Sequence, residues 1–325
     1  AAPLTIARMK DSPNTNASGD ATRAITKGRT SAEHHGAVNT PVYHASTILH
    51  PDVDSFEKRH DPNTDRRKVI YGLLGTPTTF DLEEVVADLE GGHGAVLVPS
   101  GLAAISVALL SFLRPGDHLL VADTVYPPTR SFCDQYLAAM DVTVDYYDPL
   151  VGAGIESLIQ PKTRVIFLES PGSFTFEVQD IPAITTVARK HSITTVLDNT
   201  WSTPLFFKSF SHGVDVSVHA ATKYLSGHSD VLMGAIVCAE HTWDQVKRTH
   251  RHLGQCVGPD DVYLTLRSVR NLSTRLNAHE KQGLALAKWL SQRDEVDTVL
   301  HPGLADHAGH AIWKRDFLGA SGLFS

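Results

Sequence analysis

The sequence has few cysteines and fewer basic residues than acidic ones. Its three cysteines, Cys133, Cys238 and Cys256, are too few and too widely spaced for a disulfide-rich scaffold or a cysteine-based zinc site. Lysine and arginine number 29 against 36 aspartate and glutamate residues, which gives a net charge of −7. Binding to nucleic acid needs an excess of cationic side chains, so we expect no nucleic-acid partner. The scarcity of cysteine favours a reducing compartment, and we expect a cytoplasmic protein.

The sequence also lacks a secretory signal and an uninterrupted membrane span. Residues 1–31 are polar and are typical of a flexible arm, with a transit peptide as the weaker alternative. The uncharged run 94–113 has the length of a membrane span, but Pro99-Ser100-Gly101 interrupts it with residues typical of loops. The run therefore predicts a buried strand, a tight turn and a buried helix, and we expect no membrane partner.

Short apolar runs alternate with helical patterns between residues 95 and 238. Several runs are apolar on both faces, as strands of a covered parallel sheet are. The alternation predicts an α/β fold with a doubly wound, mostly parallel sheet. The expected strands are 95–98, 118–122, 142–145, 165–168, 194–197, 214–218 and 235–237, and the expected helices are 102–113, 129–140, 155–160, 182–191 and further helical material over 260–290.

We expect three regions along the chain. Residues 1–75 have little periodicity and several prolines and asparagines, so they predict an extended arm that lies on a neighbouring subunit. Residues 76–270 form the α/β domain. Residues 271–325 begin a smaller α+β domain, and because 322–325 predict the start of a strand, we expect the chain to stop before this domain is complete.

The first candidate site residue is Lys223, which follows the strand expected at 214–218. Ligand crevices in α/β proteins form at the carboxyl ends of strands. A partly desolvated lysine there can lose its proton and form a Schiff base with a carbonyl compound, and Thr222 supplies a hydroxyl beside it. Taken alone, a lysine after a strand is more often a solvated surface residue.

Two further features occur at expected strand ends. Asp198 follows the strand 194–197 and is either a turn residue or a fixed anion for a cationic ring nitrogen. Gly101 opens a helix after the strand 95–98, where the helix N-terminus favours a phosphate, although such turns also occur for structural reasons.

Neither G-x-G-x-x-G nor the P-loop pattern is present, which removes the main support for nicotinamide and nucleotide binding. Together, these features suit pyridoxal 5′-phosphate.

The residues around Lys223 resemble the signature of the Cys/Met-metabolism family of pyridoxal-phosphate enzymes, which have the fold type I of aspartate aminotransferases. The resemblance covers almost the whole chain from Gly36. It implies that Lys223 holds the cofactor and moves protons, that Asp198 pairs with the pyridine nitrogen, and that Tyr126 stacks on the ring and assists proton transfer. The stretches that carry it are 36–40, 71–76, 89–92, 167–173, 198–201, 215–229 and 313–325.

The same resemblance implies how the phosphate is held. Gly101 and Leu102 offer backbone N–H groups and Thr222 adds a hydroxyl. Tyr71 reaches the phosphate of a neighbouring subunit, which implies a homo-oligomer, either a dimer or a dimer of dimers. Ordinary half-buried packing is the alternative for Tyr71 and Tyr126.

The chain resembles the β-lyase branch of the family more than the γ branches, on Trp201 and on the Pro-Gly-Ser at 171–173. This implies cleavage of the Cβ–S bond of cystathionine to homocysteine, pyruvate and ammonia. The alternatives are a γ-lyase or γ-synthase, a β-lyase acting on cysteine S-conjugates, and a catalytically idle scaffold or regulatory relative.

Three departures from the family pattern bear on the site. Leu73 stands where many relatives have an arginine, and Arg66, Arg67 or Lys68 are the possible substitutes. Ala220 stands where relatives often carry serine. The arginine that binds the substrate carboxylate in relatives is expected beyond residue 325. The 18 histidines show no spacing with carboxylates typical of zinc, so we expect no metal site.

Overall fold

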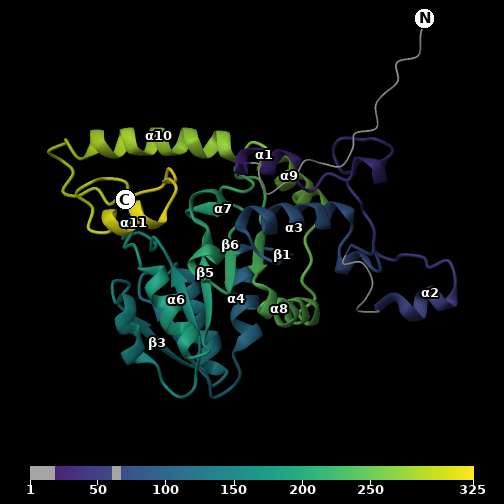
Figure 1. Cartoon of the computed structure of the whole chain (residues 1–325), viewed down its shortest axis with the longest axis horizontal. Helices are drawn as coiled ribbons and strands as arrows, with labels where there is room; N and C mark the ends of the chain where they lie inside the picture. Colours follow the sequence, from purple (N-terminus) through teal and green to yellow (C-terminus); the bar gives the residue numbers. More distant parts are fainter. Residues whose placement is uncertain (1–18, 61–66) are drawn as a thin grey trace, which may run out of the picture.

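The computed structural model describes residues 19–60 and 67–325, and its centre is a seven-stranded sheet (Figure 1). The strands lie in the order β1-β7-β6-β5-β4-β2-β3. β7 runs antiparallel to both of its neighbours, and all other neighbours are parallel. The predicted, mostly parallel sheet is confirmed. The strands are β1 (Gly94–Val98), β2 (His118–Ala122), β3 (Thr143–Tyr147), β4 (Thr163–Glu169), β5 (Thr194–Asp198), β6 (Val216–His219) and β7 (Gly234–Cys238).

Helices cover both faces of this sheet, which explains why its central strands are buried on both faces. In β1, Val96 and Val98 pack with α4 and α8, whereas Ala95 and Leu97 face α3 and α9. α6 packs against β5. The doubly wound α/β arrangement predicted from the sequence is therefore present. The α-helices are α1 (Asp20–Thr26), α2 (Val53–Glu57), α3 (Pro77–Glu90), α4 (Gly101–Phe112), α5 (Pro127–Ser131), α6 (Ile181–Lys190), α7 (Thr203–Phe206), α8 (Glu240–His252), α9 (Pro259–Val269), α10 (Leu272–Leu290) and α11 (His310–Asp316).

Some helices differ from the sequence expectation. The helix expected at 129–140 begins at Pro127 and continues from α5 into a π-helical turn over Phe132–Leu137. The one expected at 155–160 is a short 3-10 helix, Gly152–Leu158. α3 and α8 were not expected. α3 nevertheless has clear boundary signals, because proline occupies its first position and Gly91, with a φ of 80°, ends it in the left-handed conformation.

Part of the predicted arm folds back on its own chain. α1 packs against α3 and α10 (Figure 1). Arg23 forms an ion pair with Asp88 of α3, and the Arg270 guanidinium donates to the Ala24 carbonyl at 2.9 Å. α2, in contrast, lies at the far side of the molecule (Figure 1). Residues 1–18 of the predicted arm lie outside the described part of the chain.

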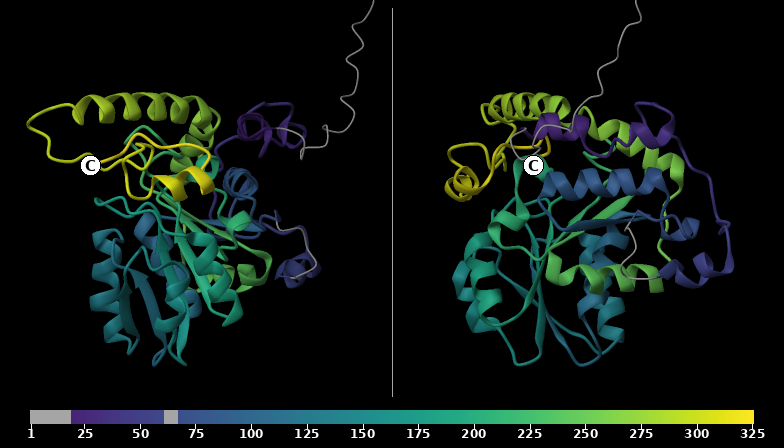
Figure 2. Two further views of the ribbon diagram at one scale, coloured as in Figure 1. Left: turned by 60° about the vertical axis from the view of Figure 1, so that its left-hand side comes forward. Right: turned by 45° about the vertical axis from the view of Figure 1, so that its right-hand side comes forward.

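The last described segment packs against the end of the sheet domain. The C-terminal loops and α11 lie below α10 in both views of Figure 2. The Phe317 ring lies 4.7 Å from that of Phe207, and Trp201 Nε1 donates to the Leu323 carbonyl at 2.9 Å. The strand expected at 322–325 is not formed, because only Ser325 exchanges backbone hydrogen bonds with Leu300. Within the described ranges, no helix combines the length and apolar character that a membrane crossing requires.

Candidate active site

The carboxyl ends of β1, β2, β4, β5 and β6 meet at one edge of the sheet, because these strands run in the same direction. This edge is where open α/β sheets bind ligands. Most of the predicted site residues lie along it, each directly after or at the end of one of these strands: Gly101 and Leu102 after β1, Tyr126 after β2, Asp198 at the end of β5, and Thr222 and Lys223 after β6.

The N-terminus of α4 has the features of an anion site. The Ser100 side chain caps the helix by accepting from the Ala103 N–H at 3.0 Å. The N–H groups of Gly101 and Leu102 find no acceptor among the described residues, and a helix N-terminus favours negative charge. A Cβ at position 101 would lie 2.6 Å from the Cβ of Ala220, so glycine allows the turn after β6 to approach this helix end. Ala220, the second departure, thus borders the candidate phosphate site.

Asp198 is a half-buried carboxylate, and among the residues described no lysine, arginine or histidine nitrogen lies within 4 Å of its oxygens. Its Oδ1 accepts from the Thr200 N–H at 2.9 Å, and the Thr200 hydroxyl accepts from the Ala220 N–H at 2.8 Å. Burial raises the pKa of Asp198, against the hydrogen bond from Thr200 and the attraction of His219. A carboxylate in this position gains by pairing with a cation, and the protonated nitrogen of a pyridine ring is such a cation.

Lys223 lies in the turn that follows β6. Its N–H donates to the Ala220 carbonyl at 2.9 Å, and its own carbonyl accepts from the Gly227 N–H at 2.7 Å. Its side chain is exposed and has no polar partner within residues 19–60 and 67–325. The sequence predicts a partly desolvated lysine, but Lys223 lies in the turn beyond the buried strand β6 and is exposed to solvent. Its amine is accessible to a carbonyl compound.

The Thr222 hydroxyl is already paired with the backbone of Met233. It accepts from the Met233 N–H at 2.9 Å and donates to the Met233 carbonyl at 3.2 Å. Donation to a phosphate requires the hydroxyl to leave the Met233 carbonyl. The contact between Thr222 and a phosphate stays a prediction.

Glu169, which the sequence analysis did not assign a role, joins Tyr126 to this edge. Its Oε2 accepts from the Tyr126 N–H at 2.8 Å, and its Oε1 accepts from the Ser173 hydroxyl at 2.5 Å. The Tyr126 side chain is 44% exposed, so its ring is free to cover a ligand. Glu169 ends β4 directly opposite Asp198. Glu169 directly follows the apolar run 165–168, as Asp198 follows the run 194–197. The pattern that identified Asp198 could therefore have identified Glu169 as well.

The burial of Glu169 beside Asp198 is expected to make stability depend on pH. Burial, followed by the nearby Asp198, raises the pKa of Glu169. Above about pH 4.3 the unfolded chain loses this proton while the folded chain keeps it, so the free energy of unfolding falls as pH rises. We expect Glu169→Gln to remove up to about 1.4 kcal/mol of this decline per pH unit. Urea unfolding of the cofactor-free protein between pH 5 and 8 measures it, and parallel curves for variant and wild type would contradict it.

Tyr71 does not join the other site residues within this chain. Its side chain is 45% exposed and lines an open groove of about 780 Å³ between the segments around α2 and residue 71. Nearby, Arg67 is paired with Asp81 at 2.5 Å and Glu84 at 3.1 Å, so its guanidinium is already neutralised. Arg66 lies outside the described residues. The groove is lined by Thr47, Ile48, Leu49, His50, Asp52, Val53, Phe56, Arg59, Ile70, Tyr71 and Leu74.

The residues at the sheet edge suit pyridoxal phosphate in three respects. The α4 N-terminus offers N–H groups without acceptors to a phosphate, Asp198 offers a negative charge to a ring nitrogen, and Lys223 offers an accessible amine to an aldehyde. No group of three His, Cys, Asp or Glu side chains in the described part of the chain has the arrangement of a metal site.

Comparisons with known proteins find relatives that match most of this chain. A Rhizobium johnstonii protein, provisionally named a cystathionine beta-lyase, is 48% identical over 316 residues, which are 97% of this chain and 78% of that protein. The cystathionine beta-lyase MetC of Escherichia coli is 42% identical over 306 residues, which are 94% of this chain and 77% of that protein. The crystal structure of MetB from Corynebacterium glutamicum matches with a TM-score of 0.89 at 29% identity, over 96% of this chain and 79% of that one.

The family comparison covers nearly the whole chain. The model described as Cys/Met metabolism PLP-dependent enzyme matches residues 21–325. This range includes the α4 N-terminus, Asp198 and Lys223, which are the residues that suit the cofactor. The chain belongs to the Cys/Met-metabolism family of pyridoxal-phosphate-dependent enzymes.

Proposed function

We propose that this chain is a cystathionine β-lyase of methionine biosynthesis. The observation that carries the proposal is its 42% identity, over 94% of its length, to a relative named cystathionine beta-lyase. The candidate site supports the same reaction, because a reactive amine, a carboxylate and an anion-binding helix end lie at one sheet edge. The reaction consumes cystathionine and water and yields homocysteine, pyruvate and ammonia.

Each site residue then has a defined task. Pyridoxal phosphate, when bound, supplies an electron sink for the charge that develops at the substrate Cα. Lys223 is its attachment point, and the freed Nζ removes the Cα proton and later returns a proton. Asp198 keeps a negative charge beside the ring nitrogen. Gly101 and Leu102 bind the phosphate through their N–H groups.

Two residues complete the site in this proposal. Tyr126 covers the ring and assists the proton transfer, and Glu169 holds the Tyr126 backbone in place through the 2.8 Å hydrogen bond. The Cβ–S bond breaks with its electron pair on sulfur, so homocysteine leaves as a thiolate that takes up a proton. The remaining unsaturated amino acid hydrolyses to pyruvate and ammonia.

The products of L-cystathionine cleavage test this function. We expect the cofactor-loaded protein to release pyruvate and homocysteine in equal amounts. Release of 2-oxobutyrate and cysteine instead would place the chain in a γ-cleaving branch. A cofactor-loaded protein that forms neither ketoacid would contradict the proposed function.

We further propose that residues of the arm around Tyr71 contact a second copy of this chain, as a dimer or a dimer of dimers. The groove lined by Tyr71 is apolar and open, with Leu49 90% exposed and Val53 69% exposed. A second copy would cover these side chains and would bring Tyr71 to the phosphate of its neighbour. We do not assign Leu73 a phosphate contact, because leucine has no donor for one.

A charge in this groove is expected to weaken the oligomer. We predict that Leu49→Glu raises the dissociation constant of the dimer at least about tenfold, because it removes the burial of a leucine. The cofactor dissociation constant should rise with it, since Tyr71 would serve a neighbouring phosphate. Analytical ultracentrifugation measures the first effect, with Leu150→Glu, 57% exposed elsewhere on the surface, as the control. Unchanged association of Leu49→Glu would contradict the assignment.

A further inference from the structure

A buried carboxylate lies beneath the candidate site and is not used by the proposed reaction. Glu90 is the last residue of α3, and its side chain is fully buried. Its Oε1 accepts from three donors: Asn199 Nδ2 at 3.0 Å, the Ser209 hydroxyl at 2.6 Å and the Ser217 hydroxyl at 2.5 Å. These donors come from segments more than a hundred residues later in the chain, so Glu90 links α3 to the region around β5 and β6.

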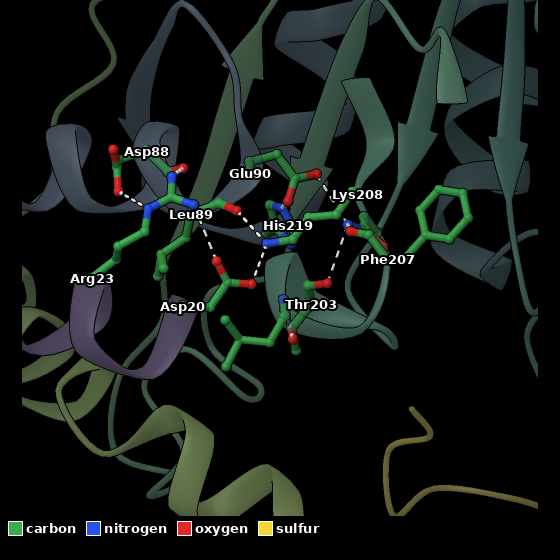
Figure 3. Close-up of polar contacts among 11 residues, drawn as sticks. Asp20, Arg23, Asp88, Leu89, Glu90, Thr203, Phe207, Lys208 and His219 are labelled. Atoms are coloured by element: carbon green, nitrogen blue, oxygen red, sulfur yellow. Dashed lines mark hydrogen bonds and ion pairs between the residues drawn. The ribbon is translucent and has the colours of Figure 1, made fainter. Parts of the chain in front are cut away.

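The second oxygen of this carboxylate faces a histidine (Figure 3). Glu90 Oε2 lies 3.5 Å from Nε2 of His219, the last residue of β6, and both side chains are almost completely buried. Neither of these two atoms has a hydrogen-bond partner among the described residues. A buried carboxylate without compensation is costly, and His219 adds to the compensation that the three donors to Oε1 supply. Burial acts to raise the pKa of Glu90, but His219 and the hydroxyls of Ser209 and Ser217 outweigh it, so this pKa is lowered.

A contact on the other side of the α3 end, made by Lys208, also holds Glu90 in position. Lys208 Nζ donates to the carbonyl of Leu89, the preceding residue, at 2.8 Å (Figure 3). The same ammonium pairs with Asp20 of α1 at 2.7 Å. The end of α3 is therefore held by a side chain on one side and by the buried donors on the other, which leaves Glu90 little freedom to move.

Glu90 and His219 are connected to Asp198 through two neighbouring residues, Asn199 and Val218. Asn199, whose amide binds Glu90, directly follows Asp198, and its backbone N–H donates to the Val218 carbonyl at 3.0 Å. Val218 pairs with Asp198 in the sheet and directly precedes His219. His219 also lowers the pKa of Asp198, against the larger effect of burial.

We propose that Glu90 and His219 are positioning residues for the cofactor ring, which fix the orientation of Asp198 through the residues next to it. The inference rests on the proposed role of Asp198 but not on the identity of the substrate. Glu90 orients His219 through the 3.5 Å pair, and His219 in turn holds the end of β6, where Val218 pairs with Asp198. Neither residue needs to touch the substrate or the cofactor.

The test compares His219→Gln with a matched buried histidine. His118, at the amino end of β2 and thus at the opposite edge of the sheet, is also buried and lies 3.1 Å from the carboxylate of Asp145. We expect His219→Gln to shift the visible absorption band of the bound cofactor. We also expect it to lower kcat about tenfold, the scale of losing an outer partner at a metal site, with KM changed less than twofold. His118→Gln should leave the band and kcat unchanged.

A double variant separates positioning from a merely structural role. Glu90→Gln combined with His219→Gln replaces the carboxylate left unpaired in His219→Gln by a neutral amide. We therefore expect it to recover the free energy of unfolding lost in His219→Gln without recovering the band or kcat. Recovery of the free energy of unfolding, the band and kcat together would overturn the proposal. A wild-type band in His219→Gln would overturn it as well. Because the band needs no substrate, a wild type that binds the cofactor but does not cleave cystathionine refutes the proposed function alone.

Discussion

Replacing Lys223 with alanine is expected to remove the visible absorption band of the cofactor-bound protein and to lower kcat/KM for cystathionine by about 10³-fold or more. Lys223 is the accessible amine at the carboxyl edge of the sheet, and its side chain has no polar partner in the described structure. The loss would remove both the attachment point of the cofactor and the group that moves protons at the substrate Cα.

Two variants make this expectation specific. Lys223→Arg keeps the positive charge but cannot form the imine, so we expect it to lose the band as the alanine variant does. Lys288→Ala removes an exposed lysine of α10 and should leave both the band and the rate unchanged. A band that survives in Lys223→Ala would assign the attachment to another amine.

Asp198→Asn is expected to lower kcat by about 10²- to 10³-fold, the scale of losing one fixed electrostatic stabiliser, with a smaller change in KM. Asparagine keeps an oxygen for the Thr200 N–H, which donates to Asp198 at 2.9 Å, but it removes the negative charge. Without that charge the ring nitrogen is less readily protonated, and the ring withdraws fewer electrons from the substrate. Steady-state kinetics and the absorption spectrum measure the effect.

The matched control is Asp215→Asn. Asp215 precedes β6, at the opposite edge of the sheet, and accepts from the Thr195 N–H at 2.8 Å in a similar way. We expect Asp215→Asn to lower the free energy of unfolding but to leave kcat unchanged. An Asp198→Asn enzyme that turns over as fast as Asp215→Asn would show that the carboxylate does not act on the ring.

Much of the sheet could be predicted from the sequence because its signals are local. Most of the seven strands are short apolar runs bounded by loop residues, and all seven are present with small shifts at their ends. Asp198 and Lys223 were identified by the same reasoning, since a chemistry-bearing residue after such a run reaches the sheet edge. The α3 helix was missed because it is buried on most of its surface, where polar residues such as Asp81 and Glu90 blur the helical period.

The relations between distant segments could not be predicted. Glu169 gains its significance from lying opposite Asp198 in the sheet, which depends on the pairing of β4 with β5. The Glu90–His219 pair joins the end of α3 to β6, and the ion pair of Arg23 with Asp88 joins α1 to α3. Each requires two segments to meet in the folded chain, and no local pattern encodes the meeting. The role of Tyr71 depends on a second copy.

The attachment of the cofactor to Lys223 is tested most directly by borohydride reduction of the cofactor-loaded protein, followed by mass mapping of its peptides. Reduction fixes an imine as a stable secondary amine, so the modified lysine is identified by its added mass. We predict a single pyridoxyl adduct on the peptide that contains Lys223. An adduct on a different lysine, or none in a protein that shows the visible band, would contradict the account.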